Sequence, residues 1–218
     1  ESPNATSCGG LAPKECSQNT DRTSLIGLDR ACFESALVKL GERSYRAKQI
    51  WHWLYYQGAH TFDEMTTLPK SLRTRLSSSC NIDRPTVNRM QQSEDGALKW
   101  LVQFADEREV ECVHIPEEDR GALCISSQVG CTLTCRFCHT GTQKLVRNLD
   151  AGEIVNQVLI ARDTIGEWPS PKDGRMISNI VMMGMGEPLY NFDNVARALR
   201  IIMDGEGISL SRRRITLS

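Results

Sequence analysis

The chain has 218 residues, 40% of them hydrophobic, which is enough for a sizeable core in one or two domains. A formal net charge of −1 excludes a polycation that coats nucleic acid without selectivity. No run of 18 apolar residues occurs, so the sequence predicts no membrane span. Nine cysteines in no disulfide-like pattern, with no signal peptide at the start, lead us to expect a cytoplasmic protein with reduced thiols.

The N-terminal part divides into a polar tail and a helical module. Residues 1–26 are rich in Ser, Thr, Asn and Gly, and we expect them to be disordered. Residues 27–82 carry apolar side chains at helical spacing. The spacing and the flanking Gly and Pro residues predict three helices, at about 28–40, 45–57 and 68–78.

Basic residues outnumber acidic ones by three between residues 28 and 80, although the whole chain is slightly negative. Four aromatic side chains accompany them: Trp51, Trp53, Tyr55 and Tyr56. This combination suits backbone and stacking contacts to folded RNA. It also suits a solvated helix face with several of the aromatic rings in the core, so both interpretations stay open.

Residues 83–120 alternate in polarity and contain turn signals, which predicts a β-hairpin region that connects the helical module to the rest. The turn Glu94-Asp95-Gly96 lies between strands expected at 87–91 and 98–104. A second reversal leads into a strand expected at 110–115.

Strands and helices alternate over residues 121–218. We expect, in order, a strand, a helix, a strand, a helix and a strand: 122–127, 151–165, 177–183, 192–204 and from near 213. This order is typical of βαβ units with a parallel sheet and with sites at the carboxyl ends of the strands. The expected fold class is α/β with an incomplete parallel barrel, because a closed barrel of eight such units needs about 250 residues.

Three cysteines lie within eight residues of the run GCTLTCRFCHTGTQ: Cys131, Cys135 and Cys138. Thiolates this close together repel one another unless a cation holds them. The C-x3-C-x2-C spacing suits an iron–sulfur cluster. Because a [4Fe–4S] cluster normally takes four cysteines, three would leave one iron open for a substrate or cofactor.

Two other metal sites fit part of the same run. Residues 135–139 read C-x-x-C-H, the pattern of covalent haem attachment in an electron carrier, but this leaves Cys131 without a role. The three thiols and His139 could instead bind a structural zinc ion in an RNA-binding module. Adjacent Cys138 and His139 would strain to reach one tetrahedral ion, so the spacing favours the cluster.

A glycine-rich run, GMGEP at residues 184–188, follows the strand expected at 177–183. Taken alone, it could form no more than a tight turn from a strand into a helix. It is expected at the same end of the sheet as the cysteine run, however, and this coincidence favours cofactor binding.

The runs CISSQVGCTLTCRFCHTGTQKLVRNL, VMMGMGEPLYN and SRRRITLS resemble the RlmN/Cfr family of radical SAM enzymes, which methylate adenine C2 in ribosomal and transfer RNA. The resemblance spans residues 27–218. It implies that residues 121–218 form the N-terminal half of a radical SAM (β/α) barrel, preceded by a helical RNA-binding domain at 27–82 and the β-hairpin region at 83–120. It also implies that the three clustered cysteines hold a [4Fe–4S] cluster, whose open iron binds S-adenosylmethionine.

Other family positions carry over one at a time. Gly186 and Glu187 of GMGEP, and Ser218, match residues that contact the cofactor. Glu111 matches a proposed proton acceptor, and Cys124 matches a cysteine thought to release the covalent RNA adduct through a transient disulfide. Without the resemblance, a strand glutamate usually faces solvent, and a cysteine in an apolar strand is usually a buried, inert thiol.

The resemblance also implies the reaction and its partners. Adenine C2 is electrophilic and its C–H bond is unactivated, so a 5′-deoxyadenosyl radical abstracts hydrogen from a methyl group carried on a cysteine, and the resulting radical adds to C2. The substrates would be 23S rRNA and tRNA, the electron donor a flavodoxin-type protein, and the full-length enzyme a monomer. The methyl-carrying cysteine would lie past residue 218, so we expect this chain to be a fragment that cannot methylate RNA by itself.

Overall fold

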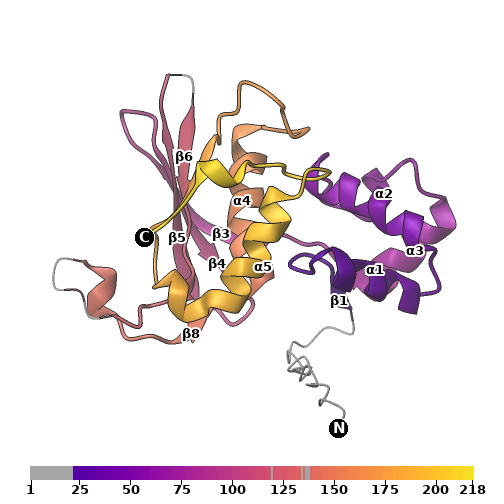
Figure 1. Cartoon of the computed structure of the whole chain (residues 1–218), viewed down its shortest axis with the longest axis horizontal. Coiled ribbons are helices and arrows are strands. Elements are labelled where there is room, and N and C mark those ends of the chain that lie inside the picture. The colour runs from indigo at the N-terminus through magenta and orange to yellow at the C-terminus, as the bar shows by residue number, and fades with distance from the viewer. Residues whose placement is uncertain (1–21, 119, 134, 136–137) are drawn as a thin grey trace, which may run out of the picture.

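Figure 1 shows the computed structural model of the chain, which describes residues 22–118, 120–133, 135 and 138–218. A helical module lies beside a six-stranded sheet, and two long helices, α4 and α5, pack between them (Figure 1). Across the described residues, no helix is both long enough and apolar enough to cross a membrane.

The helical module contains the three helices that the sequence predicts, each within about two residues of its expected ends: α1 (Arg30–Lys39), α2 (Ser44–Tyr55) and α3 (Lys70–Ser79). The 3-10 turn η1 (Phe62–Glu64) lies between α2 and α3. Trp51 and Tyr55 are fully buried on α2, whereas Trp53 and Tyr56 are only half-buried. The aromatic residues are therefore divided between the core and the surface.

The first strand corrects the expected length of the disordered tail. Residues 1–21 lie outside the described part of the chain, so the expectation for them is untested. Residues 22–26 are folded: β1 (Thr23–Ser24) pairs in parallel with β2 (Cys80–Asn81), and Leu25 and Ile26 are buried. The polar composition hid this strand because its partner lies more than fifty residues away in the sequence.

The main sheet has the strand order β10-β9-β6-β5-β4-β3. Its strands are β3 (Thr86–Gln92), β4 (Leu98–Gln103), β5 (Glu109–Pro116), β6 (Gly121–Cys124), β9 (Asn179–Met182) and β10 (Ile215–Leu217). Strands β6, β9 and β10 are parallel, and β3 to β6 are antiparallel. The predicted hairpin at residues 94–96 is confirmed. The strand expected at 122–127 ends at Cys124, and the last strand begins at Ile215, after a 3-10 turn, η4 (Arg212–Arg214).

The two faces of the sheet differ in what covers them. Helices α4 (Ala151–Ile165) and α5 (Phe192–Met203) cover one face, where Trp100, Leu123 and Ile180 are fully buried (Figure 1). No α-helix of the described residues lies over the opposite face, which we call the open face. This arrangement is the α/β partial barrel that the sequence predicts. Its open face corresponds to the side that faces the interior in a closed barrel.

Candidate cluster and cofactor site

The cysteine run forms a loop that leaves and returns at the carboxyl end of β6. Two short strands close its base, where β7 (Gln128–Val129) pairs with β8 (Arg147–Asn148). One further bridge joins Cys131 to Lys144. We did not predict these strands, because two residues are too few for an alternating pattern to be recognised. They hold the loop against the sheet end where parallel strands place functional residues.

The three cysteines are half-buried, free thiols on this loop. The N–H of Leu133 donates to Cys131 Sγ at 3.4 Å, and the N–H of Cys138 donates to the Cys135 carbonyl at 3.1 Å. A backbone hydrogen bond from Gly141 holds the pKa of the Cys138 thiol below its usual value. Among the described residues, no three Cys, His, Asp or Glu side chains lie close enough to hold a metal ion, so the thiols share a loop but not a common centre.

The chemistry of the loop fits an iron–sulfur cluster. Between residues 130 and 146 the sequence contains three cysteines and no Asp or Glu. Thiolates are soft ligands that suit iron–sulfur clusters, and a hydrogen bond from a backbone amide to sulfur stabilises the thiolate form. The donor set therefore fits a cluster bound by Cys131, Cys135 and Cys138.

Gln128 joins the cysteine loop to the GMGEP run. Its side chain is 1% exposed, and its Oε1 accepts the backbone N–H of Glu187 at 2.9 Å and that of Thr132 at 3.3 Å. Its Nε2 donates to Thr132 Oγ1 at 2.9 Å and to Asn148 Oδ1 at 2.7 Å. No signal in the sequence identified this residue, because nothing local to Gln128 shows that Glu187 lies beside it.

The GMGEP run packs directly on the backbone that follows β6. Gly186 has φ = +96°, and a Cβ added there would lie 2.5 Å from Gln128 Cβ. The N–H of Met185 donates to Ser126 Oγ at 2.8 Å, and its carbonyl accepts the N–H of Ser127 at 2.8 Å. These contacts explain the glycine at 186 without a ligand, and its role in cofactor binding stays a prediction.

Glu187 and Ser218 lie at the same end of the sheet. The Glu187 carboxylate accepts the N–H of Leu189 at 3.2 Å and so caps the 3-10 turn η3 (Pro188–Asn191). Ser218 is exposed and follows β10, where Leu217 pairs with Met182 just before the GMGEP run. The carboxyl ends of β6, β9 and β10 thus bring the two predicted cofactor loops and Ser218 together.

Glu111 lies near the cysteine loop and the GMGEP run, whereas Cys124 lies further along the sheet, on the strand next to that of Glu111. A cavity of about 470 Å³ is lined by Glu111 together with His139, Lys144 and Met185. Lys99 Nζ donates to Glu111 Oε1 at 2.9 Å, so the carboxylate has a cationic partner. Cys124 does not line this cavity.

Cys124 is a half-buried, free thiol on the open face, paired with Val113 of β5. Glu111 is two residues from Val113 and therefore lies on the same face. Burial raises the pKa of the Cys124 thiol, which favours its protonated form. Because Cys124 is a free thiol here, the transient disulfide expected for it stays a prediction.

Two family models together match most of the described chain. The model of the ribosomal RNA large subunit methyltransferase N-terminal domain matches residues 23–82, and that of the radical SAM superfamily matches residues 125–218.

Known proteins are similar over nearly the whole chain. The dual-specificity RNA methyltransferase RlmN of Rhodospirillum rubrum is 61% identical over 202 residues, which are 92% of this chain and 47% of the relative. That of Gluconobacter oxydans is 56% identical over 212 residues, 95% of this chain and 52% of the relative. A crystal structure of a radical SAM methyltransferase from Sphaerobacter thermophilus has a TM-score of 0.81 at 42% identity, and covers 89% of this chain and 56% of that protein.

The parallel strands, the cysteine loop at their carboxyl ends and these matches define the class of the molecule as a partial radical SAM domain with a fused helical module. Within that superfamily, the chain is similar to the RlmN proteins, both in the N-terminal domain model that matches residues 23–82 and in the two relatives at 56–61% identity. It spans about half the length of the curated relatives it matches.

Proposed function

We propose that this chain is part of a cytoplasmic radical SAM methyltransferase that modifies C2 of adenine in 23S rRNA and tRNA. The observation that carries the proposal is the meeting of the cysteine loop, the GMGEP run and Glu111 at the carboxyl ends of the parallel strands. Similarity to the dual-specificity RNA methyltransferase RlmN supports the RNA substrates. Residues 27–82 would then be the RNA-binding domain, 83–120 the connecting strands and 121–218 the first half of the barrel.

Each residue of the candidate site would have a separate role. Cys131, Cys135 and Cys138 would hold a [4Fe–4S] cluster. The cluster would supply one electron to S-adenosylmethionine and so the radical chemistry that an unactivated C2–H bond requires. Gly186, Glu187 and Ser218 would contact the cofactor from neighbouring strand ends. Glu111 would accept a proton within the cavity that it lines, and Cys124 would act in release of the RNA adduct. A flavodoxin-type protein would supply the electron.

The proposal is tested by anaerobic reconstitution of the 218-residue chain with iron and sulfide. We expect about four iron atoms per chain, and an EPR spectrum of the reduced protein that changes when S-adenosylmethionine is added. Cys131→Ser should lose most of the iron, because it removes one cluster ligand. The matched control is Cys32→Ser, which changes an exposed, free thiol on α1 and should keep the full iron content.

Two results would contradict the proposal. One tightly bound zinc ion and no cluster would instead indicate an RNA-binding module with structural zinc. Equal iron content in Cys131→Ser and Cys32→Ser would show that the cysteine loop does not bind the cluster.

A further inference from the structure

A second polar cavity lies at the other end of the parallel strands, away from the cysteine loop. Its volume is about 720 Å³, and its lining includes Arg120 directly before β6, Ser178 directly before β9 and Arg214 directly before β10. The loops at 170–175 and 205–211 complete its walls. We call this cavity the basic groove.

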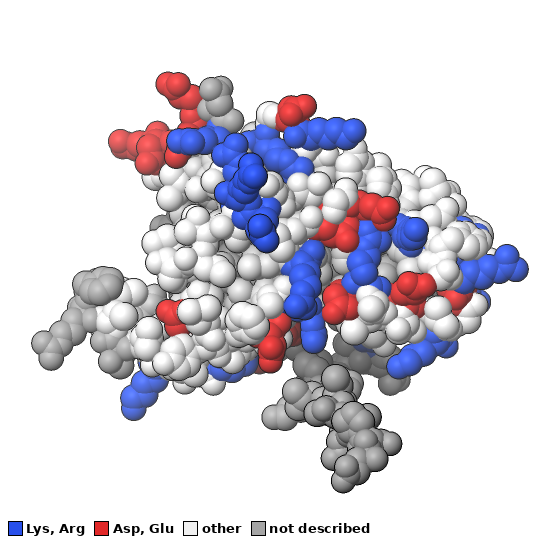
Figure 2. Space-filling view, viewed as in Figure 1, with Lys and Arg blue, Asp and Glu red and all other residues white. Residues whose placement is uncertain are grey.

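Positive charge dominates the basic groove. Arg120, Lys172, Arg175 and Arg214 line it, against one carboxylate, that of Asp173. Apart from Arg120, which pairs with Glu117, none of these cations forms an ion pair within the described chain. Figure 2 shows Lys and Arg side chains gathered over this part of the molecule. Unpaired cations around a concave surface favour an anionic ligand.

One of these arginines is held by two hydrogen bonds, and a second has a single polar contact. Arg175 is half-buried and donates to the carbonyl of Ile208 at 2.9 Å and to that of Ser209 at 3.2 Å. Arg214 contacts the side-chain oxygen of Asn179 at 3.5 Å. The neutral carbonyl oxygens orient the Arg175 guanidinium and form no ion pair with it, although the Glu167 carboxylate acts on its charge from a greater distance. Such groups lose little side-chain freedom when they bind phosphate.

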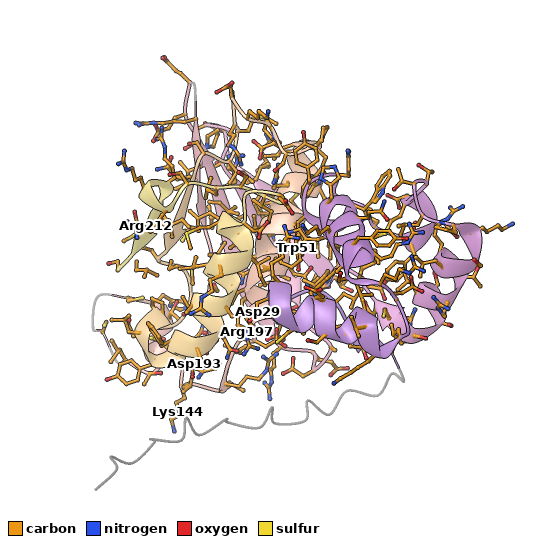
Figure 3. The ribbon with its side chains drawn as sticks, turned by 45° about the vertical axis from the view of Figure 1, so that its right-hand side comes forward. Asp29, Trp51, Lys144, Asp193, Arg197 and Arg212 are labelled. Atoms are coloured by element: carbon orange, nitrogen blue, oxygen red, sulfur yellow. The ribbon has the colours of Figure 1, made fainter. Side chains whose placement is uncertain are left out.

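The positive surface is extended rather than focused on one point. The exposed Arg212 and Arg213 continue it beside Arg214, and Figure 3 shows Arg212 far from Lys144 of the cysteine loop. A neighbouring cavity of about 560 Å³ shares Tyr56 and Gly205 with the basic groove, so the two form one continuous track. This cavity adds Lys48 and His52 of α2, and its one carboxylate, that of Glu206, is paired with Arg30.

Aromatic rings accompany the cations on this track. The rings of His52 and Tyr56 stack with centroids 4.5 Å apart, and His52 is exposed. A small anion would require cations that converge on a single centre. Cations spread along a track, with stacked rings at one end, fit a chain of phosphates and bases instead.

We propose that the basic groove binds the ribose–phosphate backbone of the RNA substrate at a point remote from the nucleotide that is modified. This inference rests on the proposed function, which supplies RNA as the substrate. The groove lies at the opposite end of the strands from the cysteine loop, so the bound RNA must contact two separate regions of the protein. Binding at the groove contributes affinity without base selection, because phosphates carry no sequence information.

The test measures the affinity of the 218-residue chain for folded tRNA by fluorescence anisotropy over a series of NaCl concentrations. The variant Arg214→Gln is compared with Arg89→Gln, which removes one charge from an exposed position on β3, at the opposite edge of the sheet. Arg214→Gln should reduce the slope of log affinity against log salt by about one. Relative to 1 M salt, this corresponds to a loss of affinity of about tenfold at about 0.1 M salt.

The double variant Lys172→Gln/Arg214→Gln should lose more affinity than the single variant, and Arg89→Gln should bind like the unmodified chain. Thermal melts establish that each variant is folded, as expected for exposed side chains. Equal affinity and salt slope in Arg214→Gln and Arg89→Gln would overturn the groove as an RNA site. That result would leave the proposed function intact, since iron content and the response to S-adenosylmethionine are measured without RNA. A chain that binds no tRNA even at low salt also overturns the inference.

Discussion

At the scale of single residues, Gln128 connects the loops that form the candidate site. Its buried amide accepts from Glu187 and donates to Thr132 and Asn148, so one side chain joins the GMGEP run, the cysteine loop and β8. Gly186 packs against the same side chain. A buried amide with both ends satisfied holds its partners in one geometry, because any alternative leaves a buried polar group without a hydrogen bond.

We therefore expect Gln128→Ala to lower the free energy of unfolding by about 1 kcal/mol, since it leaves the partly buried N–H of Glu187 without an acceptor. Iron content after reconstitution should be unchanged, but the change in the EPR spectrum on adding S-adenosylmethionine should weaken, because the two loops are no longer aligned. Gln103→Ala, at a half-buried position on β4, is the control. A full response to S-adenosylmethionine in Gln128→Ala would exclude the positioning role.

At the scale of elements, helix α4 orients both the loop base and the backbone that follows β6. Its N-cap, Asp150, accepts the N–H of Glu153 at 2.8 Å, and Glu153 accepts the N–H of Asp150 at 2.9 Å. Arg147 of β8 donates to the same Glu153 carboxylate at 2.7 Å. Further along the helix, Gln157 pairs with the backbone of Ser126, accepting its N–H at 2.8 Å and donating to its carbonyl at 2.9 Å.

The reciprocal hydrogen bonds of Asp150 and Glu153 form a capping box, which predicts the effect of Asp150→Ala. Loss of the side-chain acceptor leaves the first turn of α4 without its cap, which typically costs about 1 kcal/mol. In urea unfolding, this change appears as a lower urea concentration at the midpoint, while the dependence of the unfolding free energy on urea concentration stays the same. Asp173→Ala, at an exposed loop position, should leave the midpoint where it is. Identical midpoints for Asp150→Ala and the unmodified chain would show that the cap contributes nothing to stability.

At the scale of the whole molecule, an ionic junction joins the helical module to the partial barrel. Arg30 of α1 donates to both carboxylate oxygens of Asp204, at 2.8 and 2.6 Å, and to Glu206 at 2.9 Å. Trp51 Nε1 also donates to Asp204 at 3.2 Å, and the Arg30 guanidinium lies 4.2 Å from the Trp51 ring. The junction adjoins the cavity on α2 that continues the basic groove, so it fixes the module relative to the sheet end.

This junction predicts a pH-dependent effect of Asp204→Asn. Burial raises the pKa of Asp204, but the hydrogen bonds and charge of Arg30 outweigh it, so the pKa lies below the ordinary value of 3.8. A carboxylate with a depressed pKa stabilises the fold above its ordinary pKa, and this contribution is lost as the pH falls through the depressed value.

We expect Asp204→Asn to lower the free energy of unfolding by about 1 kcal/mol at pH 7, a modest figure because Arg30 is partly exposed to solvent. The difference from the unmodified chain should shrink as the pH falls below about 3.8, because the unfolded chain then takes up a proton at Asp204 before the folded chain does. Urea unfolding of both chains between pH 7 and pH 3 measures this difference in the free energy of unfolding. Asp193→Asn, at an exposed position near the start of α5, should show little difference at any pH. A difference for Asp204→Asn that is constant from pH 7 to pH 3 would contradict the ionic origin.

Local patterns were sufficient for the order of the α-helices and of the main-sheet strands, and for the location of the candidate loops. The helix expected at 151–165 has those bounds in the structure, because its cap at Asp150 and its stop at Gly166 are both local in sequence. The cysteine spacing and the GMGEP run were recognisable for the same reason. Their placement at neighbouring strand ends followed from the alternation of strands and helices.

The sequence by itself thus determined the fold class, the helices, the hairpin and the loops that carry the candidate ligands. Tertiary structure alone decided which of these residues meet: β1 with β2, Gln128 with Glu187 across 59 positions, and Glu111 with the cysteine loop across one cavity. It also revealed the basic groove, whose cations come from three separate segments. The physical reason is that hydrogen-bonding periodicity and capping act over a few neighbouring residues, whereas side-chain packing and charge depend on distances that only the folded chain defines.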